Sequence, residues 1–348
     1  MRSYVRAGYG LTALFLFVLS LQVMSQATDP LVPFIRQYMD VLVHDARSAL
    51  ATGWLSAYIF LNGSSVAALG LALFGSGLFT SVETFLVVAG SRIGAAFIVV
   101  LIGAVEYLQG KNDDLRDSSS IGILGFLVAY LIYVPAILLG LLVARNVDMA
   151  AVNIIDGGGG FTSVLAVLDP VIAFILASMP PYIAFLLAFA GLFVSLELFD
   201  HAFAELSADR FENRYFRYLM GTPWIAMAVG ALATLVTTSV AISVGLIVPL
   251  YNKGYYIKRK EIIPYLMGAN ITTLADTLFA AVVLDTYIGF NLVLLLGAAA
   301  TLVTLVYLVF YDRFYGVVKF LFDKVVTDRR YMLFFALSLT LLPLLLFL

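Results

Sequence analysis

Long apolar runs recur along the whole chain, and they constrain the fold more than any other feature of the sequence. An α-helix needs about 20 apolar residues to cross about 30 Å of hydrocarbon. The 348 residues are 62% hydrophobic and only 12% charged, whereas soluble domains are roughly 25% charged. A chain with so little polar surface needs a bilayer as its solvent. We therefore expect an all-α, multi-pass protein of the cell membrane.

Charge and residue usage exclude several classes of function. The formal net charge is −2 and no long basic block exists, so nucleic acid is not expected as a partner. Cysteine is absent, which excludes disulfides, thiolate metal sites and cysteine nucleophiles. No phosphate loop, nucleotide fingerprint or nucleophile elbow is present, and no acid–base pair stands out at helical spacing. We therefore expect neither an enzyme nor a bound cofactor.

Two charge-free runs are interrupted by polar residues in the same way. The first, residues 50–78, is broken at residues 62–65 (Asn-Gly-Ser-Ser), and the second, residues 221–252, is broken at residues 237–239 (Thr-Thr-Ser). Each run is typical of two short helices folded back at a polar tip, which is a broken re-entrant hairpin. Broken helices at corresponding places in two halves of a chain indicate a transporter with internal repeats.

Superimposing one half of the sequence on the other supports a repeat. The aligned pairs are Ser65 with Ser239, Glu83 with Glu261, and residues 90–95 (GSRIGA) with residues 268–273 (GANITT). The two glutamates begin their expected helices, where a carboxylate stabilises the helix N-terminus, so we expect them to be caps. The alternative is a role as gate or cation ligand.

The repeats divide the chain into four parts. We expect a first membrane repeat over residues 1–156, a Gly-rich connector with a short apolar segment over residues 157–181, and a second repeat over residues 182–311. A cytoplasmic loop and a C-terminal helix follow over residues 312–348. The depth of the short apolar segment in the membrane stays open.

Loop charge predicts that the repeats are inverted. Residues 75–82, after the first broken run, contain no Lys or Arg, whereas residues 253–260, after the second, contain four. By the positive-inside rule these equivalent loops face opposite sides of the membrane, and the N-terminus lies in the cytoplasm. An alternative interpretation takes residues 10–24 as a secretory signal; we favour a retained first helix.

A hydroxyl-rich helix break followed by a Gly-Ala-Asn-Ile-Thr-Thr helix in the second half, with a divergent counterpart in the first, resembles the type II sodium-dependent phosphate cotransporter family. Repeats of that family carry a Gln-Ser-Ser-Ser tip and a Gly-Ala-Asn-Ile-Gly-Thr-Thr helix. The resemblance covers residues 8–107 and 182–310, with a divergent first repeat at residues 62–65 and 90–96. It implies sodium-coupled symport of inorganic phosphate, by alternating access at a midplane site between the two tips.

The chemistry of a broken membrane helix points to the same kind of ligand. Backbone groups freed by the break need partners; the N–H end favours an anion, and carbonyl and hydroxyl oxygens suit sodium. The plain alternative for each hydroxyl is a structural role, in which it donates a hydrogen bond to a carbonyl oxygen in the preceding turn of its own helix. The expected substrate-binding residues are Asn62, Ser64, Ser65, Arg92, Thr237, Thr238, Ser239, Asn270, Thr272 and Thr273. The candidate sodium ligands are Ser65, Ser239, Asn270 and Thr273.

Arg92 is the basic residue of greatest interest, because an ionisable side chain inside a bilayer is costly and marks a functional candidate. It lies roughly nine residues into its expected helix, hence roughly 14 Å deep. Two hypotheses follow. Arg92 supplies a fixed cation to the anion site in place of one sodium ion, or it forms a buried pair with Asp276 that acts only as a structural lock.

Two alternatives to a sodium-coupled phosphate symporter stay open. The altered first repeat could remove a cation site, which would give a sodium-independent transporter or a transporter of another anion. A channel or a non-transporting membrane sensor could keep the same fold without the transport site.

Overall fold

The protein is described here as a computed structural model that covers residues 3–108, 115–152, 165–204, 220–240, 243–244 and 259–348. These residues form helices and turns, with no strand among them. Seven of the described stretches are long and apolar enough to cross a membrane. The expected class, an all-α multi-pass membrane protein, is therefore confirmed.

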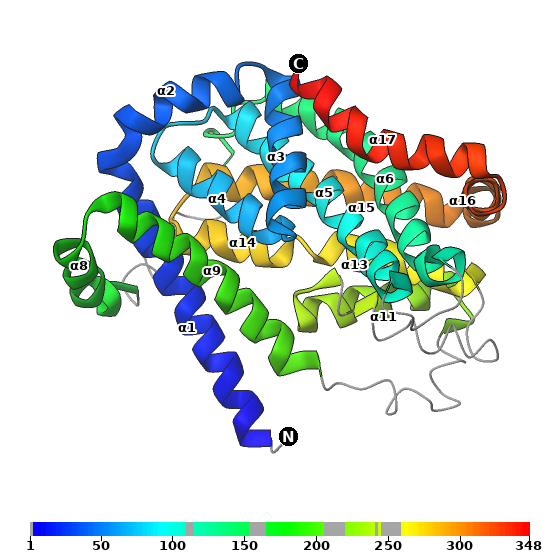
Figure 1. Ribbon diagram of the computed structural model, residues 1–348, viewed down its shortest axis with the longest axis horizontal. Coiled ribbons are helices and arrows are strands. Elements are labelled where there is room, and N and C mark those ends of the chain that lie inside the picture. Colours follow the sequence, from blue (N-terminus) through cyan, green and yellow to red (C-terminus); the bar gives the residue numbers. More distant parts are fainter. Residues whose placement is uncertain (1–2, 109–114, 153–164, 205–219, 241–242, 245–258) are drawn as a thin grey trace.

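The helices follow the chain in two halves and a C-terminal pair (Figure 1). The first half holds α1 (Ser3–Thr28), η1 (Asp29–Leu31), α2 (Val32–Leu42), α3 (Ala46–Phe60), α4 (Gly63–Gly75), α5 (Ser81–Leu108) and α6 (Leu115–Asn146). The second half holds η2 (Ala166–Leu168), α8 (Asp169–Ser178), α9 (Pro181–Ala204), α11 (Pro223–Thr237), α13 (Arg259–Thr272), α14 (Ala275–Val283) and α15 (Tyr287–Val309). The C-terminal pair is α16 (Tyr311–Thr327) and α17 (Arg329–Phe347).

The first predicted helix break is present. Helix α3 ends at Phe60, and α4 begins at Gly63 after Leu61 and Asn62. In the second run, α11 ends at Thr237 as predicted. The following arm of that run falls largely outside the described residues, as does the glycine run of residues 157–160.

Both breaks share one backbone feature. Leu61 has a φ of 50° and Thr238 a φ of 55°, the left-handed region that L residues rarely adopt. Each is the first residue after its helix, since α3 ends at Phe60 and α11 ends at Thr237. The alignment of Ser65 with Ser239 in the sequence does not pair these two positions.

Glycines bring the helices on either side of each break into backbone contact. In the first half, a Cβ on Gly90 of α5 would lie 2.1 Å from the carbonyl oxygen of Leu50 in α3. In the second half, a Cβ on Gly268 of α13 would lie 2.0 Å from the carbonyl oxygen of Met227 in α11. Such distances are far below any contact a real methyl group makes. The same close packing thus occurs at the two glycines that the sequence alignment pairs.

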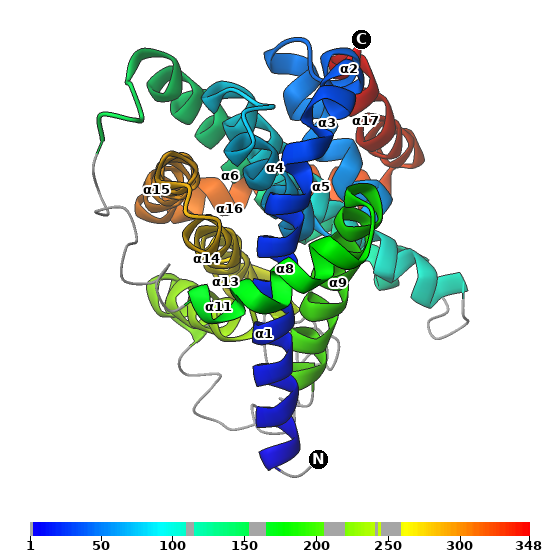
Figure 2. The same cartoon turned by 90° about the vertical axis from the view of Figure 1, so that its left-hand side faces the viewer.

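The long helices α1 and α9 lie side by side, and both views show them as a pair beside the rest of the molecule (Figures 1 and 2). Gly191 of α9 allows this approach, because a Cβ there would lie 2.6 Å from the hydroxyl oxygen of Ser20. Helix α8 is shorter: ten residues span only about 15 Å, half of the hydrocarbon thickness. The described part of the segment 164–178, whose depth the sequence left open, is therefore shorter than a full membrane span.

The start of the C-terminal region differs from the prediction. We expected a loop at residue 312, whereas residues 311–327 form α16. Its apolar side chains at positions 311, 314, 318, 322 and 325 are buried and recur every three or four residues, which is the spacing of one helix face. The sequence prediction gave weight to the basic residues between them and missed this spacing.

Two helix N-termini carry capping boxes. The Asp45 carboxylate accepts the backbone N–H of Ser48 at 2.7 Å, while the Ser48 hydroxyl accepts the backbone N–H of Asp45 at 2.9 Å. At α5 the Glu83 carboxylate accepts the backbone N–H of Thr80 at 2.7 Å. The prediction that Glu83 is a cap is confirmed.

Replacing Gly268 by alanine should disrupt the contact between α11 and α13. We expect a loss of about 3 kcal/mol in unfolding free energy, because the new methyl group meets backbone that has no free space to move into. Gly316→Ala in α16 is the matched control, since a Cβ there has nothing within 4 Å. Thermal unfolding in detergent measures both variants. Equal melting temperatures would contradict the backbone contact.

Asp45 should give α3 an acid-sensitive cap. The backbone N–H of Ser48 and the nearby Arg47 lower the pKa of Asp45 to about 2, so the cap is intact at neutral pH and is lost as the pH falls from about 4 towards 2. Asp45→Ala should cost about 1 kcal/mol at pH 7, and Asp45→Asn, which still caps, much less. In thermal unfolding, the gap between the wild type and Asp45→Ala should shrink towards pH 2. An unchanged gap would argue against the cap.

Candidate functional site

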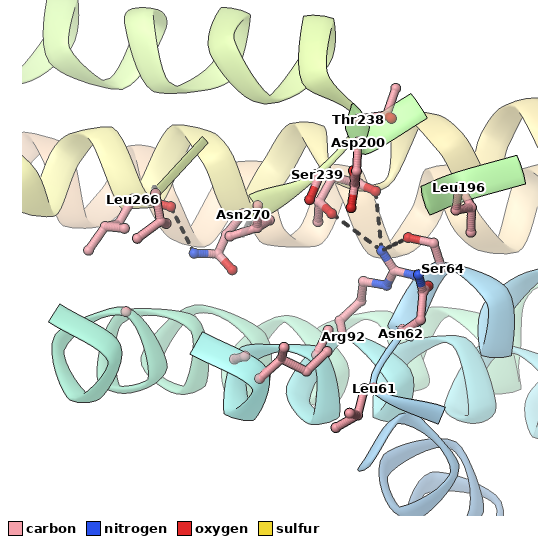
Figure 3. Close-up of a pocket in the computed structure, with 18 of the residues that line it drawn as sticks. Leu61, Asn62, Ser64, Arg92, Leu196, Asp200, Thr238, Ser239, Leu266 and Asn270 are labelled. Carbon is pink, nitrogen blue, oxygen red and sulfur yellow. Dashed lines mark hydrogen bonds between the residues drawn. The ribbon is translucent and has the colours of Figure 1, made fainter. Parts of the chain in front are cut away.

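A cavity of about 280 Å³ lies where the two helix breaks meet α5, α6, α9 and α13 (Figure 3). Its walls combine residues that are far apart in the sequence, from both halves of the chain. The polar residues that line it are Asn62, Ser64, Arg92, Tyr133, Asp200, Thr238, Ser239, Asn270 and Thr273.

Seven of the ten predicted substrate-binding residues line this cavity, and Ser65, Thr237 and Thr272 do not. The Thr237 hydroxyl donates to the carbonyl oxygen of Ala233 at 2.9 Å, one turn back. The Thr272 hydroxyl donates to the carbonyl oxygen of Ala231 at 2.9 Å, and so joins α13 to α11. These two threonines bond to backbone, as the plain alternative for membrane hydroxyls predicts. The structure therefore does not place these two threonines on the cavity wall.

Ser65 has a different environment. Its backbone N–H donates to the Asn62 side-chain oxygen at 2.9 Å, so Asn62 is the N-cap of α4. The Ser65 side chain is fully buried, and its hydroxyl has no hydrogen-bond partner among the described residues. A buried hydroxyl without a partner is costly, which keeps Ser65 a candidate ligand close to, but not on, the cavity wall.

Helix α4 begins directly against α5. A Cβ on Gly63 would lie 2.5 Å from the carbonyl oxygen of Ser91, so only glycine permits this approach. The N-terminus of α4, with its unpaired N–H groups and the positive end of its dipole, is thereby held next to Arg92. Positive charge and N–H donors are concentrated at one side of the cavity.

Arg92 is the most buried charge of the site, with a relative exposure of 3%. Its Nη1 donates to the carbonyl oxygen of Thr273 at 3.2 Å, to the Thr273 hydroxyl at 3.4 Å and to the Ser64 hydroxyl at 3.5 Å (Figure 3). Its Nε donates to the Ser91 hydroxyl at 3.4 Å. The Nη2 group has no acceptor among the described residues. One nitrogen of the guanidinium is therefore buried without an acceptor among the described residues.

Asp276 lies beside Arg92. Its Oδ1 is 4.0 Å from Nη1 of Arg92, and both side chains are buried. The Thr277 hydroxyl donates to the same Oδ1 at 2.9 Å, while Oδ2 has no partner in the described part of the chain. A pair that served only as a structural lock would have its remaining donors and acceptors satisfied. This pair leaves one nitrogen and one oxygen open.

An interruption between α13 and α14 supplies backbone carbonyl oxygens that accept hydrogen bonds from Arg92 and Tyr133. The helix stops at Thr272 and resumes at Ala275, so the carbonyl oxygen of Thr273 accepts from Arg92 and that of Asn270 accepts from the Tyr133 hydroxyl at 2.6 Å. The Gly-Ala-Asn-Ile-Thr-Thr helix expected from the sequence therefore ends within its own motif, at Thr272.

Sequence analysis missed Tyr133 and Asp200. Tyr133 gave no signal, because one tyrosine in an apolar helix is usually packing. Asp200 lies on α9 and hydrogen-bonds through its side chain to Ser239. The apolar run before Asp200 ends at Phe199, whereas α9 continues to Ala204 and so includes Asp200 as a charge inside the helix.

Comparison with protein-family models gives no match for this chain. No curated protein and no solved structure matches it either. The interpretation of the site therefore rests on its own geometry and charges.

The buried pair of Arg92 and Asp276 predicts a large stability difference from a surface pair. Asp276→Asn should cost about 3 kcal/mol or more, because it leaves a buried guanidinium without its counter-charge. Asp312→Asn breaks the exposed pair with Lys260, whose atoms are closer at 2.6 Å, and should cost less than about 1 kcal/mol. Thermal unfolding in detergent compares the two. Similar losses would show that Asp276 does not stabilise Arg92.

Proposed function

We propose that this protein is a secondary active transporter of a small oxyanion, with inorganic phosphate as the substrate and sodium as the coupling ion. The observation that carries the proposal is the free Nη2 of Arg92, buried beside a cavity lined by hydroxyl groups. A buried guanidinium with an unused donor is well suited to an oxyanion, which accepts charge-assisted hydrogen bonds from a planar fork.

The rest of the cavity also favours a small anion. Ser64, Thr238 and Ser239 contribute hydroxyl donors, and the N-terminus of α4 adds its dipole. A volume of about 280 Å³ is below the range typical of drug-sized ligands, roughly 300–1,000 Å³. An inorganic oxyanion with a few water molecules suits such a space.

The oxygen atoms near Arg92 support sodium as the coupling ion. Oxygen atoms of Asp276 and Ser65 lack partners in the described residues, and oxygens freed by helix breaks coordinate sodium in transporters. Of the other predicted sodium ligands, Asn270 and Ser239 line the cavity. Both oxygens of Thr273 accept from Arg92. This last contact favours the hypothesis that Arg92 replaces one sodium ion, and it makes a sodium-independent phosphate transporter the second candidate.

Alternating access has a rationale in the two halves of the chain. The glycine contacts of α5 with α3 and of α13 with α11 recur at corresponding positions, and each helix break has one residue in the left-handed region. Two equivalent halves around one central site are the arrangement of inverted-repeat transporters. Arg92 is eleven residues from the start of α5, so roughly 17 Å along it, which is near the middle of a bilayer.

Uptake of labelled phosphate into proteoliposomes tests the proposal. The wild type should accumulate phosphate when an inward sodium gradient is imposed, and a tenfold excess of sulfate should not compete. Arg92→Asn should lose at least about tenfold in uptake at low sodium and recover at high sodium, because a mobile cation then replaces the fixed one. Lys319→Gln, on α16, is the control for loss of a positive charge elsewhere.

Three other outcomes have separate meanings. Wild-type uptake without sodium would identify the sodium-independent alternative, and inhibition by sulfate would indicate another anion as substrate. No uptake under any condition would contradict transport and leave a sensor or channel on this fold.

A further inference from the structure

Two carboxylates and one guanidinium lie at or beside the cavity. Asp200 lines the wall together with Arg92, and it lies close enough to Asp276 for their charges to interact. With all three groups ionised, the site carries a net charge of −1, and a bound anion would add to it. Uncompensated charge inside a membrane is costly, so anion binding requires a cation to arrive with it.

The two carboxylates differ in how their charge is balanced. Asp276 has Arg92 at 4.0 Å and a hydroxyl donor from Thr277. No Lys, Arg or His nitrogen lies within 4.0 Å of Asp200 in the described part of the chain. Two acidic groups act on the charge of Asp200, namely Glu197 on α9 and Asp276 on α14. Protonation is therefore more favourable at Asp200 than at Asp276.

Among the side chains that the structure describes, the helices packed against α9 add no opposing charge. The described side chains of α1, α4 and α11 include no Asp, Glu, Lys or Arg. Asp169 of α8 and Asp29 of η1 belong to the other elements in contact with α9. His201, the next residue, is exposed and has its ring 6.3 Å from the ring of Tyr9.

We propose that Asp200 takes up a proton whenever the anion binds, so that a proton crosses the membrane with each anion. This inference rests on the proposed anion transport. The proton crosses the membrane in addition to any sodium ion that is coupled to the anion. On the side of entry, an O–H bond forms between a proton from water and a carboxylate oxygen of Asp200. On the other side the same bond breaks, and the proton leaves with the anion.

Ser239 is the hydrogen-bond partner that suits Asp200 both as a charged carboxylate and as a protonated acid. A serine hydroxyl both donates and accepts hydrogen bonds. The hydroxyl donates to Asp200 when the carboxylate is charged, and it accepts from Asp200 when the acid is protonated. Figure 3 shows the two side chains together on the side of the cavity that faces Arg92. Because Ser239 follows Thr238 at the second helix break, the proton site is tied to the segment expected to move during transport.

The test uses proteoliposomes with the full chain, equal sodium on both sides and labelled phosphate. Two quantities are measured: exchange of external for internal phosphate at equal pH, and net accumulation driven by an outside-acid gradient of one pH unit. One proton coupled to each anion supports up to about tenfold accumulation. Asp200→Asn is nearly isosteric and carries no titratable group, so it should keep measurable exchange and lose accumulation driven by the gradient.

The controls separate this inference from the proposed function. Asp312→Asn removes an exposed carboxylate on α16, which does not line the cavity, and should behave like the wild type. Asp200→Glu should restore part of the gradient response. Phosphate changes its own ionisation with pH, but every variant meets the same mixture of ions, so that effect cancels in the comparison.

Each remaining outcome is decisive. Accumulation by Asp200→Asn equal to the wild type would overturn the proton role and leave anion transport intact. Loss of exchange together with accumulation in Asp200→Asn would also overturn it, because Asp200 would then be needed to bind the anion or to fold the site. Absence of exchange in the wild type would refute the proposed function itself.

Discussion

The burial of one guanidinium is the constraint on which the rest of this structure depends. A charged side chain in the middle of a membrane helix has a cost of several kcal/mol unless other groups replace the water it has lost. Around Arg92 those groups are the oxygens of Thr273, the hydroxyl of Ser64 and the carboxylate of Asp276. They satisfy one side of the guanidinium and leave Nη2 open, so the charge is held in place without being fully neutralised.

Interruptions of helices make this solvation possible. An unbroken helix uses its own carbonyl oxygens, and only the stop at Thr272 releases an oxygen that reaches α5. The break at Leu61 places the start of α4 beside the same arginine. Glycines then let the arms approach to backbone contact, at Gly63 in the first half and Gly268 in the second. Helix breaks, glycines and the buried charge thus form one interdependent arrangement.

Much of this could be predicted from the sequence, because several signals are local. Uninterrupted apolar runs determine the membrane class, a polar segment in such a run marks the break near residue 62, and Glu83 follows a helix-start pattern. Other features depend on distant partners. Nothing near Thr273 resembles a helix stop, since neither Gly nor Pro occurs there, and Asp200 gains its meaning only from an approach of α9 to the two breaks. The hydroxyls of Thr237 and Thr272 look identical to binding hydroxyls in the sequence, and only their backbone bonds separate them.

The central claim is that the open side of Arg92 is where an oxyanion binds. Tungstate is a tetrahedral oxyanion with heavy scattering, so its position in a structure determined with tungstate present locates the site directly. We expect one ordered tungstate in the cavity, accepting from Nη2 of Arg92 and from the Ser64 hydroxyl, and absent in Arg92→Asn. A cavity without tungstate, in which Nη2 bonds instead to a protein oxygen, would show that Arg92 is a structural lock and would contradict the claim.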